Sequence, residues 1–474
     1  MQPIQTSTRP GKGFHSEVLD VPGADPIGFL EALEGEPRGF WGHQDHWVAW
    51  GGVLARIEVL SGAGRSRFDE VRAEAKRIFR RIYTDWGAIP FRERPRFFGG
   101  FSFLEDVEDK VTWSGFPAAG FILPRVILEA RGGEVRFRVA GFTPWGMRGS
   151  DPETEELASN LLEVLRAPQR SASPVPLNPE YDDASSPRET EDSDAEKGPE
   201  RERWDGMVST ILGEVAEGRV RKAVLARILD AEFTGPVDPL VGLEFLRSEN
   251  RRAHVYLFEP HVGRTFLGAA PEILAELRRG QFRSTAVAGS MPRGMTDDED
   301  QEFARLLLDS EKDRVEHQLT ADEMVEVLAS RLSDMQVEQD PRVLALARIQ
   351  HLETVISGST GPDEDILSLV EGLHPTPAVC GSPRDEAHVL IHAAEPFDRG
   401  WYAGPVGWFD LVGEGGFVPG LRAAIGEGRS WRLFAGAGIV AGSDPEGEWE
   451  ETALKFEPAL RALRVAAGEP PGGV

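Results

Sequence analysis

One lysine stands in a segment whose composition is that of a buried strand. The stretch RVRKAVLARIL covers residues 219–229 and carries Lys222 in its first half. The chain has only 7 lysines among its 52 basic residues, so arginine supplies most of the positive charge. Burial can lower the pKa of a lysine until it serves as a base, whereas a guanidinium stays protonated. Lys222 is therefore a candidate base, with a solvated strand face as the ordinary alternative.

A candidate general acid lies about fifty residues further on. Glu272 follows a Gly-Ala-Ala-Pro turn in FLGAAPEIL, at the end of an apolar run. Burial in an apolar turn raises the pKa of a carboxyl group, so that it can donate a proton near neutral pH. The alternative is structural, because Pro271 and Glu272 also suit the first turn of a helix.

Two pairs of acidic residues could bind a cation. Asp313 and Glu316 stand three residues apart in SEKDRVEHQL, and Glu448 and Glu451 repeat this spacing in DPEGEWEETALKF. Residues at i and i+3 share a helix face, so each pair would present two oxygen ligands. Hard ligands of this kind favour Mg²⁺ over zinc. In a chain this acidic, either pair could equally belong to a solvated helix face.

Glycine-rich turns accompany these residues. Gly436, Gly438 and Gly442 interrupt an apolar strand in FAGAGIVAGSDP, and Gly289 precedes Ser290 in TAVAGSMPRG. Glycine allows backbone N–H groups to approach an anion closely. Each turn alone is a weak signal, and the order of the motifs along the chain is more informative.

The elements that must position these residues form a mixed pattern. Short apolar runs in the first third predict strands, with a helix over 68–83. In the second half, strands alternate with long amphipathic helices, notably over 298–332. Such a mixture predicts an α/β architecture with many antiparallel strands.

One segment divides the chain. Residues 167–203 are rich in proline, serine and charge and nearly lack large apolar residues, which predicts a disordered acidic linker or an exposed loop. We therefore expect an N-terminal part, 1–166, that completes the sheet core, then a catalytic region over 204–465. A flexible tail is expected over 466–474.

Composition excludes several classes of function. The 474 residues carry a net charge of −27, which disfavours nucleic acid as a partner. A single cysteine, Cys380, excludes an intrachain disulfide framework and thiolate metal clusters. The start of the chain lacks an apolar signal segment, and no run of 18 apolar residues occurs. We therefore expect a cytoplasmic protein that does not enter a membrane.

Eight motifs resemble, in order and spacing, those of the chorismate-utilising enzymes, and more closely those of the isochorismate synthases. They are KAVLAR, GAAPE, AVAGSMPRG, SEKDRVEH, HPTPAVCG, YAGPVG, LRAAI and GAGIVAGSDPEGEWEETALK. The resemblance covers about residues 204–463, whereas the preceding part matches only in its general run of strands. It implies an α/β (α+β) fold of large layered antiparallel sheets, with outer helices and a central cleft.

The resemblance also implies a reaction. Water attacks C2 of chorismate, the C4 hydroxyl leaves and the ring double bonds shift, with Lys222 as the base and Glu272 as the acid. A Mg²⁺ ion holds the ring carboxylate; its implied ligands are Glu316 and Glu451, with Asp313 and Glu448 close by. The residues implied to contact chorismate are Gly289, Ser290, His374, Tyr402, Arg422, Gly436, Gly438 and Lys455.

Members of the family differ in their nucleophile. Anthranilate synthases carry glutamine in place of Lys222 and need a glutaminase subunit, which we therefore do not expect. Aminodeoxychorismate synthases carry a lysine in place of Ala288. Salicylate synthases keep residues of the Lys222 and Glu272 types and then eliminate pyruvate, so they are the main alternative.

An inactive paralogue with a regulatory role is disfavoured, because the implied acid, base and metal ligands are all present. We expect a monomer or a weak homodimer. The product could enter menaquinone, siderophore or salicylate biosynthesis.

Overall fold

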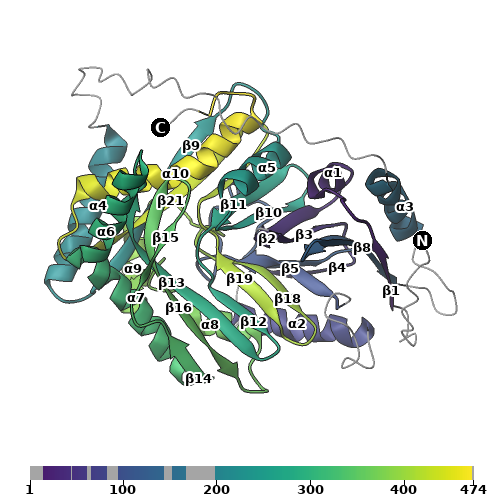
Figure 1. The fold of residues 1–474 in the computed structure, drawn as a ribbon, viewed down its shortest axis with the longest axis horizontal. Coiled ribbons are helices and arrows are strands. Elements are labelled where there is room, and N and C mark those ends of the chain that lie inside the picture. Colours follow the sequence, from purple (N-terminus) through teal and green to yellow (C-terminus); the bar gives the residue numbers. More distant parts are fainter. Residues whose placement is uncertain are drawn as a thin grey trace.

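A computed structural model describes residues 14–43, 45–60, 66–82, 94–142, 152–166 and 198–471. Within these ranges the long strands form two antiparallel sheets, and helices cover their outer faces (Figure 1). The mixed α/β fold of layered antiparallel sheets that the sequence predicts is thereby confirmed.

Sheet 1 contains 11 strands of the described chain. In spatial order they are β1 (Phe14–Asp20), β8 (Glu134–Phe142), β7 (Val126–Arg131), β3 (His46–Gly51), β2 (Arg38–His43), β10 (His254–His261), β11 (Arg264–Ala270), β20 (Ala423–Glu427), β21 (Ser430–Val440), β9 (Lys222–Glu232) and β17 (Gly381–Ser382).

Sheet 2 contains 10 strands of the described chain. In spatial order they are β14 (Leu332–Val337), β16 (Ile349–Thr360), β13 (Gln281–Pro292), β12 (Ala275–Arg278), β19 (Gly415–Pro419), β18 (Pro405–Asp410), β5 (Arg96–Phe101), β6 (Ala119–Leu123) and β4 (Ala55–Val59), with β15 (Arg342–Ala345) paired to β16.

The helices and sheets form four layers, because each sheet buries both of its faces. The outer face of sheet 1 packs on α1 (Pro26–Glu31), α3 (Pro152–Arg166), α5 (Pro239–Glu249) and α10 (Pro445–Ala466). The outer face of sheet 2 packs on α2 (Arg67–Ile82), α7 (Glu311–Ala329) and α8 (Ile366–Leu373). An aromatic-rich core joins the two inner faces, and α4 (Pro199–Ala216) and α9 (Arg384–Ala394) extend it beside β9.

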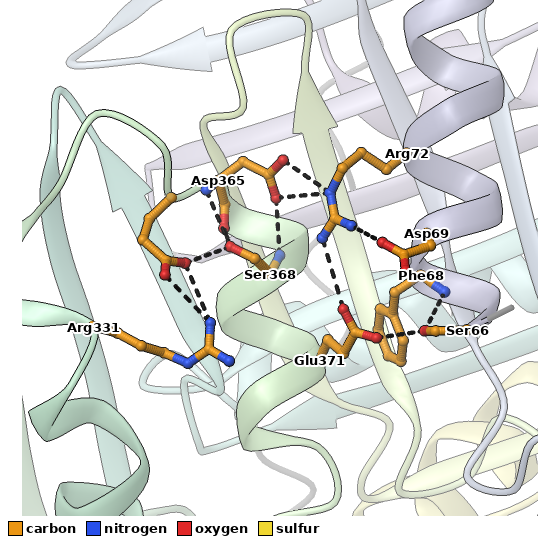
Figure 2. Close-up of polar contacts among 9 residues, drawn as sticks. Ser66, Phe68, Asp69, Arg72, Arg331, Asp365, Ser368 and Glu371 are labelled. Carbon is orange, nitrogen blue, oxygen red and sulfur yellow. Dashed lines mark hydrogen bonds and ion pairs between the residues drawn. The ribbon is translucent and has the colours of Figure 1, made fainter.

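The first third of the chain is built into both sheets. In sheet 1, β2 pairs with β10, and in sheet 2, β5 pairs with β18. Helices add a polar connection, because Nε of Arg72 on α2 lies 3.0 Å from an oxygen of Asp365, the N-cap of α8 (Figure 2). Arg72 also pairs with Asp69 and Glu371, and the hydroxyl of Ser66 donates to Glu371.

Local signals explain where the helices begin. Asp25, Asp238, Asp365 and Asp444 cap α1, α5, α8 and α10 by accepting from a backbone N–H of the first turn. The prediction of one helix over 298–332 is wrong in one respect. The segment is divided into α6 (Asp297–Asp309) and α7, because Ser310 has extended backbone angles and caps α7.

Two predicted boundaries also shift. Residues 167–197 of the predicted linker lie outside the described residues, but α4 already begins at Pro199, where proline and the acidic residues Glu200 and Glu202 favour a first turn. At the other end, α10 includes Ala466, and the carboxylate of Glu469 accepts hydrogen bonds from Thr234. The part of the predicted tail that is described is therefore attached to the fold. None of the described helices has the length and apolar character that a membrane crossing requires.

Candidate active site

Two crossings of the chain between the sheets meet at one pocket. Glu272 lies between β11 of sheet 1 and β12 of sheet 2, and Arg422 lies between β19 of sheet 2 and β20 of sheet 1. Both side chains are buried and both residues line the pocket. The other polar or glycine residues that line it are Gly289, Ser290, Glu316, His351, Arg399, Tyr402, Gly436, Gly438, Glu451 and Lys455.

Lys222 lies directly behind this pocket. Its side chain is 0% exposed, because β21 and β17 flank β9 and the first residues of β9 are buried on both faces. The alternative of a solvated strand face is therefore wrong. The Nζ atom lies 3.0 Å from Oε1 of Glu316 and donates to Oγ1 of Thr320 at 3.2 Å. Glu316 itself lines the pocket, so the Lys222 amine contacts a residue of the pocket wall.

The carboxyl group of Glu272 holds its proton at neutral pH. Burial raises the pKa of its carboxyl group to about 8, against a smaller opposing effect of the Lys222 charge. Its Oε1 is buried and has no hydrogen-bond partner among the described residues. The alternative of a first-turn helix residue is wrong, since Glu272 lies in the connection between two strands. A buried, neutral carboxyl beside a pocket is what a general acid requires.

The four acidic residues lie near the starts of two helices, which the ion pair between Lys312 and Glu448 joins. Asp313 and Glu316 come from the first half of α7, and Glu448 and Glu451 come from the first half of α10. Glu316 and Glu451 line the pocket, whereas the other two do not. We call these four residues the acidic cluster.

Each glutamate of the acidic cluster is paired with a lysine. Lys222 pairs with Glu316, Lys312 lies 2.6 Å from Glu448, and Lys455 lies 2.5 Å from Glu451. Burial and the neighbouring Glu451 raise the pKa of Glu448, although Lys312 opposes them. Burial acts in the same sense on Glu451, but Lys455, Lys312 and Ser290 together outweigh it, so that the pKa of Glu451 is lowered.

The donor set of the acidic cluster suits a hard divalent cation. All four residues offer carboxylate oxygens, and ammonium groups already stand against three of them. No three His, Cys, Asp or Glu side chains in the described ranges converge on one point as metal ligands. The carboxylates are spread because each glutamate turns toward its own lysine.

Two glycines are required by close contacts at the pocket. A Cβ at Gly438 would lie 2.2 Å from Oε1 of Glu316 and 2.9 Å from Cε of Lys222. Gly289 has φ +73° at a bulge of β13, and a Cβ there would lie 2.9 Å from Cβ of Asp313. A side chain at either position would therefore push apart the groups that the site brings together.

His351 is a pocket residue that the sequence analysis missed. Its Nε2 lies 2.9 Å from the Arg422 guanidinium, and its Nδ1 lies 3.1 Å from Oγ of Ser290 and 3.2 Å from the Gly289 carbonyl oxygen. Burial, followed by the Arg422 charge, lowers its pKa well below 6.5, so the ring is neutral. Because a guanidinium can only donate, Nε2 accepts and Nδ1 carries the proton.

His374, which the resemblance implies as a substrate contact, is not among the described residues that line this pocket. It follows α8 outside the pocket lining, and its Nε2 lies 3.1 Å from the carbonyl oxygen of Phe103. Its ring packs against Phe68 and Phe103. Burial lowers its pKa well below 6.5. His374 therefore has a structural position between α8 and the first third of the chain.

Lysine usage was a signal that could have revealed a further residue. Three of the seven lysines of the chain, Lys222, Lys312 and Lys455, pair with the acidic cluster. Lys312 was not among the predicted site residues, although it lies directly before Asp313. By contrast, His351 stands in a strand segment, IQHLET, that carries no local sign of function.

Comparisons with known proteins show which family the chain belongs to. A family model described as chorismate binding enzyme matches residues 3–464. An isochorismate synthase of Bacillus subtilis, MenF, is 33% identical over 78% of this chain and 74% of its own length. A salicylate biosynthesis isochorismate synthase of Pseudomonas aeruginosa is 35% identical over 89% of this chain and 83% of its own length. The menaquinone-specific isochorismate synthase MenF of Escherichia coli has a similar structure, with a TM-score of 0.74, 24% identity and 95% of each chain covered.

Proposed function

Because this chain belongs to the family of chorismate-binding enzymes, we propose that it is an isochorismate synthase that converts chorismate to isochorismate. The observation that carries the proposal is the presence of two buried ionisable groups at one pocket, Glu272 in its lining and Lys222 behind its lining residue Glu316. Glu272 is a carboxyl group whose pKa of about 8 keeps it protonated, and Lys222 is a fully buried amine.

The proposed chemistry uses these two groups in sequence. Lys222, in its neutral form, takes a proton from water while the water oxygen bonds to C2 of chorismate. The ring double bonds shift, and the C4–oxygen bond breaks. Glu272 gives its proton to the departing hydroxyl, which leaves as water, so that one water enters and one leaves.

Cationic residues of the pocket fit a dianionic substrate such as chorismate. Arg422 is buried, and its contact with neutral His351 leaves its charge without a carboxylate partner among the described contacts. We assign it, with Tyr402, to the side-chain carboxylate of chorismate. Ser290 and Lys455 would face the ring carboxylate. The acidic cluster would hold a Mg²⁺ ion, which, when bound, supplies positive charge that neutralises and orients this carboxylate.

Product analysis tests the proposed function. Purified protein is incubated with chorismate and MgCl₂, and the products are identified by liquid chromatography and mass spectrometry. Isochorismate without pyruvate is expected, and the same reaction in excess EDTA should show no turnover. Salicylate together with pyruvate would identify a salicylate synthase instead. Anthranilate formed with ammonium present would identify an anthranilate synthase.

The assignment of Lys222 has its own test. Lys222→Met removes the amine but keeps a side chain of similar length, so it should lower kcat by about 10²- to 10⁴-fold with a much smaller change in KM. Circular dichroism should confirm that the variant is folded. Lys76→Met, which removes an exposed lysine of α2, is the control and should be as active as the unmodified protein. Turnover by Lys222→Met within a few-fold of normal would show that another group is the base.

A further inference from the structure

The three lysines that pair with the acidic cluster differ in how exposed they are. The side chain of Lys222 is 0% exposed and that of Lys455 is 16% exposed, whereas that of Lys312 is 36% exposed. Lys222 also donates to Thr320, and Lys455 also donates to the carbonyl oxygen of Gly436 at 2.8 Å. Among the described contacts, Lys312 donates only to Glu448. Lys312 is therefore the lysine that can move into solvent.

Among the described residues, Glu448 has one ion-pair partner, Lys312, and a side-chain hydrogen bond with Ser443. Its side chain is 1% exposed. A carboxylate buried to this degree is costly unless it is paired. If Lys312 turned away, another cation would have to take its place.

The position of Lys312 in its helix is unfavourable by itself. It is the second residue of α7, near the positive end of the helix dipole, where cations are disfavoured. It also stands four residues before Glu316, so both side chains lie on one face of α7. The charges of Glu448, Glu451 and Glu316 all act on its ammonium group, and together they raise its pKa in spite of burial. The ammonium therefore stands where three carboxylates need positive charge.

We propose that Lys312 is a built-in counter-cation of the acidic cluster, which holds Glu448 while no metal ion is bound and gives up its place when a divalent cation binds. The proposal rests on the proposed function, because that function assigns Mg²⁺ to this cluster. It adds a residue outside the ligand set that controls how readily the metal enters.

The charge balance of the site supports this exchange. In the resting site, where Lys222 is paired with Glu316 and has not yet acted as a base, three ammonium groups face four carboxylates, so the cluster is close to neutral before a metal ion binds. A bound divalent cation would bring excess positive charge if all three ammonium groups stayed. Departure of Lys312 removes one of these charges. The compact ammonium of lysine is suited to this role, because it acts as a point charge that binds one oxygen at a time.

Calorimetric titration with MgCl₂, in the absence of chorismate, tests the proposal. Removal of the competing charge by Lys312→Met should lower the Kd for Mg²⁺ about fivefold or more. Lys312→Arg, which keeps the charge, should leave the Kd close to normal. Lys76→Met, which removes a distant exposed charge, should also leave it unchanged.

A second measurement separates this role from general damage. In EDTA, Lys312→Met should melt at a lower temperature than the unmodified protein, because Glu448 loses its partner. Saturating MgCl₂ should close this gap, which a merely structural defect would not do. Tighter binding of Mg²⁺ with a lower Tm in EDTA is the combination that the proposal requires.

The outcomes distinguish this proposal from the proposed function. If the unmodified protein binds no Mg²⁺, the counter-cation proposal fails, whereas the proposed function fails only if product analysis also finds no isochorismate. If it binds Mg²⁺ but Lys312→Met has an equal or higher Kd, only the counter-cation is wrong. An equal gain in affinity for Lys76→Met would also overturn it, because net charge alone would then explain the effect.

Discussion

At the scale of single residues, Glu272 shows how burial changes the acidity of a carboxyl group. The carboxyl group lies in the connection between two strands, where desolvation raises its pKa to about 8. The same glutamate on a solvated helix would be ionised at neutral pH and could not donate a proton. The functional property therefore belongs to the position rather than to the residue type.

The raised pKa predicts how stability depends on pH. Between the ordinary value of 4.5 and the folded value of about 8, the native protein holds one proton more than the unfolded chain. Stability from Glu272 is therefore full below pH 4.5 and decreases as pH rises to about 8. Glu272→Gln cannot titrate, so from pH 6 to pH 9 it should gain about 2 to 3 kcal/mol in unfolding free energy relative to the unmodified protein.

Urea unfolding at the two pH values measures this difference, with the exposed Glu386→Gln of α9 as the control. An equal difference at both pH values would contradict the raised pKa. The same titration predicts that kcat/KM of the unmodified enzyme falls as pH rises above about 8, because the acid is then deprotonated.

At the scale of elements, the division between α6 and α7 sets the place of the acidic cluster. Ser310 ends the first helix and caps the second, and its Oγ accepts from the backbone N–H of Asp313 at 3.3 Å. The first turns of α7 thereby place Lys312 against Glu448 of α10, Asp313 against Ser290 of β13 and Glu316 against Lys222 of β9. A continuous helix over both segments would have turned these side chains to a different direction.

Removal of this cap should affect the metal site more than the fold. Ser310→Ala should cost about 1 kcal/mol of stability and weaken Mg²⁺ binding several-fold, because the first turn of α7 loosens. Thr296→Ala is a matched control, since Thr296 caps α6 and its Oγ1 accepts from Glu299 N at 3.2 Å. Calorimetry should find a similar loss of stability in both variants but a weaker metal affinity only in Ser310→Ala. Equal Mg²⁺ affinities would show that the cap does not position the cluster.

At the scale of the whole molecule, the two sheets pass through both parts of the chain. Without residues 1–166, β10 would lose β2 and β18 would lose β5. In the intact protein β10 and β18 are buried and apolar. In the fragment their freed edges could pair with other molecules. The inner core would also lose residues such as Trp50 and Phe98.

A fragment of residues 198–474 is therefore expected to be insoluble when expressed alone. Expression together with a fragment of residues 1–166 should recover soluble protein, because the missing strands can then pair. The solubility of each fragment and the chorismate turnover of the mixture measure this. A soluble and active fragment of 198–474 would show that the first third is an independent domain.

Much of this protein could be predicted from local sequence signals. The apolar segment around Lys222, the turn before Glu272 and the two acid pairs all depend on residues within about ten positions of one another. Order and spacing of the motifs were sufficient for the family, which the comparisons confirm. Periodicity specifies which face of an element is apolar, and this can be read from the sequence without knowledge of the fold.

Tertiary structure alone decided which distant groups meet. The contacts of Lys312 with Glu448 and of Arg422 with His351 join residues 136 and 71 positions apart. The pairing of β2 with β10 is likewise invisible in either segment. Burial of Lys222 between β21 and β17, burial of Glu272 and the place of His374 outside the pocket are likewise decided by contacts between distant segments. The physical reason is that a local pattern determines the shape of an element, whereas its partners are selected by the packing of the whole chain.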